Sequence, residues 1–345
     1  MVNVSVLAVD NCMKSSITGP HDIWSVASIQ WRQMAGKASG DLFHVQIITG
    51  TGKPVRCFNG TVVEPDQGMS EDIESDVVFI PVIYGSLEPL LNDGPMIDWL
   101  ILQHQRGAVI CAVCAGVFLA AQTGLLENRC ATTHWHLARE FQQRFPGVTL
   151  KQEKMVVDEG DFITAGGVTA YMDLSLHLCS LFGSRELSAN VSKILLIDPA
   201  RQSQSPYQAF HFNLNHGDKP ILKVQEWMQQ HASDPMTVPA LADRAGLGHR
   251  TFNRRFKKAT GDTPLEYLQQ LRIDMARNQL EFTRESIDTI TYATGYEDVS
   301  SFRRLFKRAT GLSPTAYRRK FRRDGGWSDY PSLTNLPMKI SRSSP

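Results

Sequence analysis

Two stretches of the sequence, TFNRRFKKATGDTPLEY at 251–267 and SFRRLFKRATGLSPTAY at 301–317, are copies of one pattern and decide the fold of the C-terminal part. Nine residues recur at an offset of 50 positions without a gap. The identical pairs are Phe252 and Phe302, Arg254 and Arg304, Phe256 and Phe306, Lys257 and Lys307, Ala259 and Ala309, Thr260 and Thr310, Gly261 and Gly311, Pro264 and Pro314, and Tyr267 and Tyr317. Such a repeat indicates two copies of one structural unit.

Each copy has the pattern of a helix-turn-helix, in which a short helix, a glycine turn and a second helix follow one another. A Ser or Thr caps the first helix, and a left-handed glycine ends it. In the second helix two phenylalanines four residues apart face the core, which leaves basic residues outside. The expected elements are Thr237 capping Val238–Ala245, Gly246 and His249–Ala259 in the first copy, Ser286 capping Ile287–Thr294, Gly295 and Asp298–Ala309 in the second, and a joining helix over Pro264–Glu281.

The outward side chains of the two second helices have the chemistry that reads a major groove. Arg can donate two hydrogen bonds to guanine and Asn can bond bidentately to adenine, whereas Lys is expected to contact phosphates. The outward residues are Arg250, Asn253, Arg254 and Lys257 in the first copy and Ser300, Arg303, Arg304 and Lys307 in the second. We expect these helices to enter successive major grooves about 34 Å apart. The alternative, a plain helical bundle with solvated charges, does not explain matched turns and matched arginines.

The same region resembles a known family. The stretches LADRAGLGHRTFNRRFKKATGDTPLEYLQQLRI at 241–273 and GYEDVSSFRRLFKRATGLSPTAYRRKF at 295–321 resemble the DNA-binding domain of the AraC/XylS family, and the likeness covers about 221–323. One departure is Gly248, where the family usually has a Ser cap, and it weakens the start of the first recognition helix by about a few tenths of a kcal/mol. The resemblance implies base contacts from Arg250, Asn253, Arg254, Val299, Ser300, Arg303 and Arg304.

The charge of the chain is divided unevenly between its parts. Residues 240–323 hold 18 of the 36 Lys and Arg but only 9 of the 35 Asp and Glu. The rest of the chain is therefore acidic, although the net charge of the whole is +1. A basic module on an acidic body indicates a polyanion as the partner of that module, here promoter DNA.

Length and composition predict a globular protein of two domains. The 345 residues exceed one ordinary domain, and the sequence holds no apolar run of the ~18 residues that a membrane span needs. The cysteines lack the spacing of a zinc site and fit the free thiols of a reducing compartment. They are Cys12, Cys57, Cys111, Cys114, Cys130 and Cys179. We therefore expect a cytoplasmic protein without a membrane span, a metal or a cofactor.

Residues 1–190 alternate apolar runs with amphipathic stretches, which predicts a parallel sheet covered by helices on both faces, a flavodoxin-like α/β domain. The expected strands are Val2–Val9, Phe43–Thr49, Asp76–Val82, Ala108–Val113, Met155–Val157 and Phe162–Ala165, and the expected helices are Pro20–Met34, Met96–Gln105, Gly116–Gly124, His134–Arg144 and Ala170–Leu181. Residues 191–220 are polar and predict a linker. Residues 221–323 form the expected all-α domain with two helix-turn-helix motifs, and 324–345 a disordered tail.

The segment AVICAVCAGVFLAAQ at 108–122 runs from a buried strand into a helix through Cys114. A sharp strand-to-helix turn of small residues has the layout of a nucleophile elbow, and a helix N-terminus is expected to favour the thiolate. His134 offers an imidazole base, and Asp22, placed before the first helix, offers a carboxylate. Three interpretations of Cys114 stay open: a catalytic nucleophile, part of a small-molecule pocket, or a structural or redox-sensitive thiol.

The stretch AVCAGVFLAAQTGLLENRCATTHWHLAREFQQRFPGV at 112–148 resembles the PfpI-type, class I glutamine amidotransferase-like fold, in the subgroup fused to AraC-type DNA-binding domains. The resemblance implies that Cys114, His134 and Asp22 line one ligand site, with Gly85 beside them. Two departures count against hydrolysis. Asp22 stands where relatives often have Glu, and in the turn Ile83-Tyr84-Gly85 only the glycine suits an oxyanion hole.

These observations predict a sequence-specific DNA-binding regulator of transcription whose α/β domain is not an enzyme. The resemblance implies a small-molecule effector, such as an amino acid or a quaternary amine, a homodimer formed through the α/β domain, activation rather than repression, and contact with RNA polymerase. The main alternative is a cysteine-dependent hydrolase or amidase that the helical module tethers to DNA. A DNA-organising protein without a ligand is a third possibility.

Overall fold

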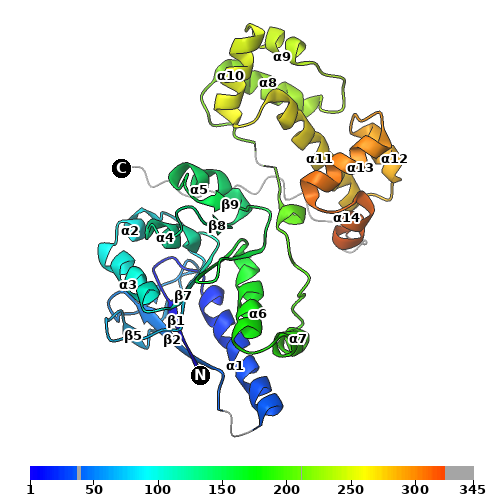
Figure 1. Ribbon diagram of the computed structural model, residues 1–345. Coiled ribbons are helices and arrows are strands. Elements are labelled where there is room, and N and C mark those ends of the chain that lie inside the picture. The colour runs from blue at the N-terminus through cyan, green and yellow to red at the C-terminus, as the bar shows by residue number, and fades with distance from the viewer. Residues whose placement is uncertain (37–39, 211, 323–345) are drawn as a thin grey trace. The chain divides into compact units, whose positions relative to one another are not determined.

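The computed structural model describes residues 1–36, 40–210 and 212–322. The chain forms two compact units, the first over Met1–Gln204 and the second from Ser205 onward (Figure 1). The tail expected at 324–345 lies outside the described residues. Within the described ranges no helix is long and apolar enough to cross a membrane, and no group of three or more His, Cys, Asp or Glu is placed to hold a metal ion.

The first unit is built on a seven-stranded sheet with the order β10-β11-β7-β6-β1-β2-β5. All neighbours are parallel except β10 and β11. The strands are β1 (Val2–Leu7), β2 (Phe43–Thr49), β5 (Gln67–Gly68), β6 (Val77–Ile80), β7 (Val109–Val113), β10 (Val156–Asp158) and β11 (Phe162–Ala165). The predicted parallel α/β architecture is therefore confirmed, and the short edge strand β5 was not foreseen.

Helices cover this sheet in two groups. One group consists of α1 (Ser15–Ala35), α6 (Tyr171–Phe182) and α7 (Arg185–Ile194), which contact one another, and the other of α2 (Glu88–Leu91), α3 (Gly94–Gln105) and α4 (Gly116–Gln122). Figure 1 shows the two groups on opposite sides of the sheet. A short helix, α5 (Ala138–Arg144), follows a 3-10 turn at Trp135–Leu137. Strands that are buried on both faces explain why the apolar runs in the sequence are continuous rather than alternating.

The first helix starts earlier than the sequence predicted. Pro20 was expected in its first turn, but α1 begins at Ser15 and contains Pro20 in its interior. The side chain of Ser16 stabilises this early start, because its hydroxyl donates to the Met13 carbonyl and accepts from the Val82 N–H. Gly19 allows α1 to pack closely on α6, since a Cβ at this position would lie 2.5 Å from the Tyr171 ring.

The second unit consists of helices arranged in two similar halves around one long helix. Its helices are α8 (Lys219–Gln230), α9 (Val238–Arg244), α10 (His249–Thr260), α11 (Pro264–Phe282), α12 (Ile287–Ala293), α13 (Val299–Thr310) and α14 (Pro314–Phe321). The first half of α11 contributes Tyr267, Leu268 and Leu271 to one core, and the second half contributes Ile273, Ala276 and Leu280 to another. Figure 1 shows α11 running between the two helix-turn-helix motifs.

The two copies of the sequence repeat pack in the same way. In each copy two fully buried phenylalanines lie on one face of the second helix, at 252 and 256 and at 302 and 306. Phe256 meets Tyr267 edge-on with ring centroids 5.3 Å apart, and Phe306 meets Tyr317 at the same distance. Two core positions and one following tyrosine therefore fix the helix orientation in both copies.

The predicted caps and turns of both motifs are confirmed. The side chain of Thr237 accepts from the Ala240 N–H and that of Ser286 from the Thr289 N–H. Gly246 and Gly295 have φ of 65° and 81°, in the left-handed region that ends the first helix of each motif. The observed helix ends differ from the predicted ones by one residue, which is the usual uncertainty at a helix end.

The residues expected to form a linker are divided between the two units. Helix α7 continues to Ile194, beyond the boundary expected at 190. Residues up to Gln204 belong to the first unit, and Phe210 and Phe212 pack against the core of the second. The polar composition of 191–220 therefore does not describe a free tether.

Candidate functional site

The exposed face of α10 carries most of the residues predicted to contact DNA in the first copy. Arg250, Arg254 and Lys257 are exposed, whereas Asn253 is half-buried and its amide lies 3.4 Å from His249 Nε2. Positions 250, 254 and 257 share one side of the helix, opposite the buried phenylalanines. The helix thus presents a row of cations on its outer face.

The corresponding face of α13 is similarly exposed. Arg304 is exposed and donates to the Ser301 hydroxyl at 3.1 Å. Arg303 lies 3.6 Å from Asp288 in an ion pair whose two side chains are more than half exposed. The remaining predicted residues of this copy are Val299, which is half-buried, and Ser300 and Lys307, which are exposed. Contacts this exposed contribute little to folding, so the arginines remain available to a ligand.

The two recognition helices begin differently. Asp298 caps α13 by accepting from the Ser300 and Ser301 N–H groups. The pKa of Asp298 is lowered by the Ser301 hydroxyl first and then by these backbone N–H groups. Gly248, at the same place before α10, provides no side-chain cap. The departure noted in the sequence thus leaves the first N–H groups of α10 without the acceptor that α13 has.

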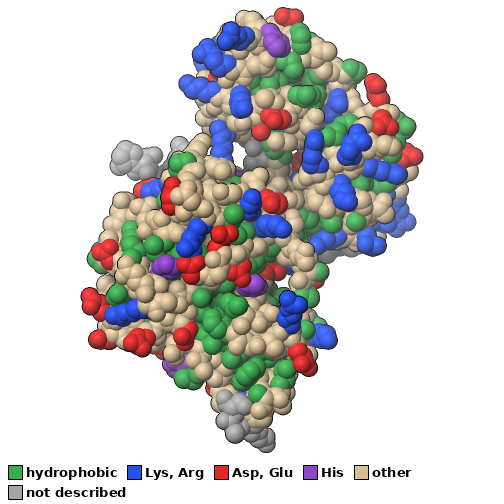
Figure 2. All heavy atoms as spheres, in the orientation of Figure 1, with side chains coloured by type: hydrophobic (Ala, Val, Ile, Leu, Met, Phe, Trp, Pro, Cys, Tyr) green, Lys and Arg blue, Asp and Glu red, His purple; other side chains and the backbone are tan. Residues whose placement is uncertain are grey.

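Other cations of the second unit stabilise the fold instead of facing outward. Arg255 donates two bonds to the Asp218 carboxylate, at 2.9 and 2.7 Å. Arg272 donates to the Ala232 and Asp234 carbonyls. Arg318 donates to the Glu285 carbonyl at 2.6 Å. Figure 2 shows that many lysine and arginine side chains nevertheless lie at the surface of this unit.

In the first unit, Cys114 forms the predicted sharp turn between β7 and α4. Its φ of 57° lies in the left-handed region that non-glycine residues rarely adopt. Its N–H donates to the Ala165 carbonyl, and its own carbonyl accepts from the Thr133 hydroxyl at 2.6 Å. Gly116 permits the turn to pack, because a Cβ there would lie 2.4 Å from the Pro81 carbonyl oxygen.

Burial raises the pKa of the Cys114 thiol, whereas the N-terminus of α4 was expected to favour the thiolate. The residue is 5% exposed, and burial raises its pKa to about 12, with only the Ala115 N–H acting to lower it. Removing the charged form from water therefore outweighs the helix end. A raised pKa favours the neutral thiol over the nucleophilic thiolate.

The other predicted site residues are placed as follows. His134 is half-buried directly before the 3-10 turn, and its Nδ1 accepts from the His136 N–H. Gly85 is exposed, with φ of 79° and open space around it. Asp22 does not precede the first helix but lies exposed within α1. The pKa of Tyr171 is raised mainly by burial, and the charge of Asp22 adds to this effect. Asp22 lies inside both the expected helix, Pro20–Met34, and the observed α1, so its placement before the helix was wrong.

Sequence reasoning missed a tyrosine beside the elbow. The pKa of Tyr84 is raised by burial and by the proximity of Cys114. Its ring stacks on Phe58, with centroids 4.3 Å apart, and Phe58 is 59% exposed. Phe58 follows β3 (Val55–Arg56), so nothing local in the sequence connects it with Tyr84. The two rings form an aromatic surface next to the elbow.

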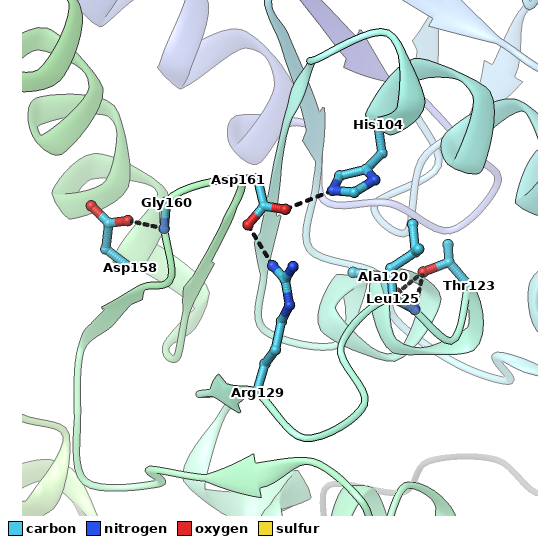
Figure 3. Close-up of polar contacts among 8 residues, drawn as sticks. All are labelled: His104, Ala120, Thr123, Leu125, Arg129, Asp158, Gly160 and Asp161. Atoms are coloured by element: carbon cyan, nitrogen blue, oxygen red, sulfur yellow. Dashed lines mark hydrogen bonds and ion pairs between the residues drawn. The ribbon is translucent and has the colours of Figure 1, made fainter.

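A polar cluster lies at the ends of the strands opposite to Cys114. Asp161 accepts from Arg129 and interacts with His104 Nε2 at 2.7 Å (Figure 3), and these contacts, led by Arg129, lower its pKa to about 2. Asp161 immediately precedes β11, whereas Cys114 follows the end of the parallel neighbour β7. The cluster is therefore separated from the elbow by the length of the strands, and it stabilises the fold.

Two parts of the chain match known families. Residues 28–181 match the DJ-1/PfpI family, and residues 241–320 match a helix-turn-helix domain. The HTH-type transcriptional regulator CdhR of Pseudomonas aeruginosa is 29% identical over 280 residues, which cover 80% of this chain and 82% of that protein. The HTH-type transcriptional regulator GbdR of the same species is 26% identical over 278 residues, covering 80% and 75%.

A likeness to a solved structure supports the fold of the first unit. A crystal structure from Vibrio parahaemolyticus is similar with a TM-score of 0.50 at 22% identity, and it covers 56% of this chain and 98% of that one. The alignments with the two regulators are longer than the first unit of this chain, so they include residues of both units.

Proposed function

We propose that α10 and α13 read the base sequence of promoter DNA, because this chain belongs to the AraC-type transcription regulators with an N-terminal DJ-1/PfpI domain. The observation that carries this proposal is the pair of exposed arginines, Arg254 and Arg304, at identical positions of two identically packed helices. An exposed arginine on a recognition helix can donate both of its bonds to one guanine.

The arginines proposed to contact bases are exposed, whereas a neighbouring arginine is held by a carboxylate in two hydrogen bonds. Arg255 is adjacent to Arg254 in sequence but is held by Asp218. Lys257 and Lys307 lie exposed near the ends of their helices and are proposed to contact phosphates. Arg250, Asn253, Val299, Ser300 and Arg303 complete the proposed base-contacting set.

Selection from random duplexes tests this proposal. The full chain is incubated with a pool of random DNA, and bound duplexes are recovered and sequenced over several rounds. We expect enrichment of a site with two conserved blocks, one for each recognition helix. Recovery of unrelated sequences with no enriched block would show that the chain binds DNA without reading its sequence.

We further propose that the region around Cys114 binds a small effector without chemical turnover. Clefts at the carboxyl ends of parallel strands are the usual ligand sites of α/β sheets. Phe58 and Tyr84 offer an aromatic face there, which suits the cation of a quaternary amine or an amino acid. His134 and Gly85 are included as proposed effector contacts, and Asp22 is carried forward only from the resemblance.

One observation favours the competing cysteine hydrolase, namely the left-handed backbone of Cys114 at a strand-to-helix turn. The raised pKa of its thiol counts against a nucleophile. Cys114→Ser in a reporter strain separates the two, because the substitution should abolish control if turnover is the signal and preserve it if binding suffices. A thermal-shift screen with amino acids and quaternary amines then identifies the effector class.

The remaining parts of the proposal come from the resemblance. They are activation of transcription through RNA polymerase and a homodimer formed through the first unit. Light scattering of the full chain and of a chain truncated after the first unit tests the dimer, which should persist in both. A monomeric first unit would place any dimer contact elsewhere.

A further inference from the structure

Gln204, the last residue of the first unit, is buried although it lies in a polar stretch. It is 2% exposed, and its Nε2 lies within 3.2 Å of four acceptors. Its Oε1 accepts from the Trp135 N–H at 3.2 Å. The acceptors are the Thr132 hydroxyl and the carbonyls of Thr133, Gln152 and Lys154. A side chain with this many buried polar contacts is held in one position.

The residues before Gln204 fasten the chain along the edge of the sheet. Arg201 pairs with Asp173 at 2.6 Å. The Gln202 carbonyl accepts from the Met155 N–H, and the Gln204 N–H donates to the Glu153 carbonyl. Gly166 leaves room for the Gln204 side chain, because a Cβ at position 166 would lie 1.8 Å from Gln204 Nε2.

The contacts of Gln204 lead directly to the elbow. Its amide donates to the Thr133 carbonyl at 2.9 Å, and the Thr133 hydroxyl donates to the Cys114 carbonyl at 2.6 Å. Gln204 also holds Trp135, which directly follows His134 in the chain. The loop that carries the proposed effector contact is thus bonded on one side to Cys114 and on the other to Gln204.

The residues after Gln204 are bonded within the second unit. Arg277, which is 8% exposed on α11, donates to the carbonyls of Ser205 and Gln208. A few residues later, the Asn213 amide donates to the Ala259 carbonyl near the end of α10 at 3.1 Å. The segment that enters the second unit is therefore bonded both to the helix that joins the two motifs and to a recognition helix.

We propose that Gln204 is the positioning residue through which the effector site controls the DNA-binding unit. This inference rests on the proposed function of the first unit as a sensor. A ligand that moves the 132–135 loop changes the bonds of Gln204, and Ser205, the next residue in the chain, accepts a bond from Arg277.

The test uses hydrogen exchange of the full chain, which requires neither an effector nor DNA. Thr133→Val removes the hydroxyl bond to Cys114 and serves as the perturbation at the elbow. Gln204→Met removes the amide bonds at similar volume, and Gln202→Met, at an exposed neighbour, is the matched control. The measured quantity is the exchange rate of backbone amides in 205–208 and around Arg277.

We expect Thr133→Val to accelerate exchange in these peptides by ~10-fold in the native background, and to have no further effect when combined with Gln204→Met. Gln202→Met should leave the response to Thr133→Val intact. Independent, multiplicative effects of Thr133→Val and Gln204→Met would overturn the proposal, as would an elbow substitution without effect on the second unit. A merely structural role for Gln204 predicts that independence.

A second variant covers the case in which Gln204→Met fails to fold. Gln204→Asn keeps a neutral amide but is one methylene shorter, which draws its donor away from the Thr133 carbonyl, so it should give the same lost response. If the exchange results hold while no metabolite shifts the thermal transition, the coupling stands and the sensor function fails. If metabolites bind but the exchange effects are independent, the sensor function stands and the coupling fails.

Discussion

Arg254→Ala should convert a specific DNA interaction into a nonspecific one. The side chain is exposed on α10 between Arg250 and Lys257, so its loss leaves the buried face of the helix untouched. Surface substitutions of this kind usually change the free energy of unfolding by less than about 0.5 kcal/mol. Any large loss in binding therefore reflects the contact with DNA and not unfolding.

The expected magnitude follows from the chemistry of a single base contact. A bidentate arginine–guanine pair contributes about 1–3 kcal/mol to discrimination, which corresponds to a rise of roughly 5- to 150-fold in Kd on the selected site. The affinity for duplexes in which that base pair is changed should fall much less in Arg254→Ala, because the native chain does not make the arginine–guanine contact on those duplexes. Arg304→Ala should show the same behaviour at a different base pair.

Fluorescence anisotropy at several salt concentrations measures these effects. Arg255→Ala is the matched control, because it removes the same charge from the next position but from a side chain bound to Asp218. Lys257→Ala should weaken all duplexes alike and reduce the slope of log K against log salt by about 0.9. Equal losses for Arg254→Ala on the selected and altered duplexes, or losses equal to those of Arg255→Ala, would refute the assignment as a base reader.

Three further predictions concern the caps, the polar cluster and the thiol. Gly248→Ser should raise the free energy of unfolding by about a few tenths of a kcal/mol, because the site before α10 has open space and no side-chain cap; urea unfolding checks this, and a loss of stability would contradict it. The pKa of Asp161 is about 2 in the folded chain, below the usual value of an unfolded Asp, about 3.9. Its contribution to the free energy of unfolding is therefore present above pH 4 and is lost as the pH falls toward 2. The urea midpoint of Asp161→Asn should depend less on pH over this range than that of the native chain, and identical pH profiles would be inconsistent with the ion pair. Cys114 should react with iodoacetamide at pH 8 far more slowly than a free cysteine, because burial raises its pKa to about 12; mass spectrometry of the modified peptides decides, and rapid labelling of this residue would restore the nucleophile interpretation.

The features that the sequence predicted well depend on contacts close in the chain. The run Phe43–Thr49 is the observed strand β2 to the residue, because its β-branched residues, Val45, Ile47, Ile48 and Thr49, favour an extended strand. The caps at Thr237 and Ser286 were identified because a cap bonds to an N–H three residues away. Both helix-turn-helix motifs followed from such local rules.

The features that the sequence did not predict depend on distant partners. Gln204 lies among polar residues and predicts a linker, but its acceptors are 50 to 72 positions away. The early start of α1 uses a bond between Ser16 and Val82, 66 positions apart. The pKa of Cys114 depends on how many groups surround the sulfur, and a helix N-terminus read from the sequence gives no measure of that burial.

Methylation interference on the selected DNA site tests the use of two recognition helices most directly, because methylation of guanine N7 blocks the atom that an arginine contacts in the major groove. The full chain should show two groups of interfering guanines about one helical turn apart, and Arg254→Ala should lose the interference in one group while Arg304→Ala loses it in the other. Interference confined to one group, or unaffected by both substitutions, would contradict a pair of helices that each read DNA.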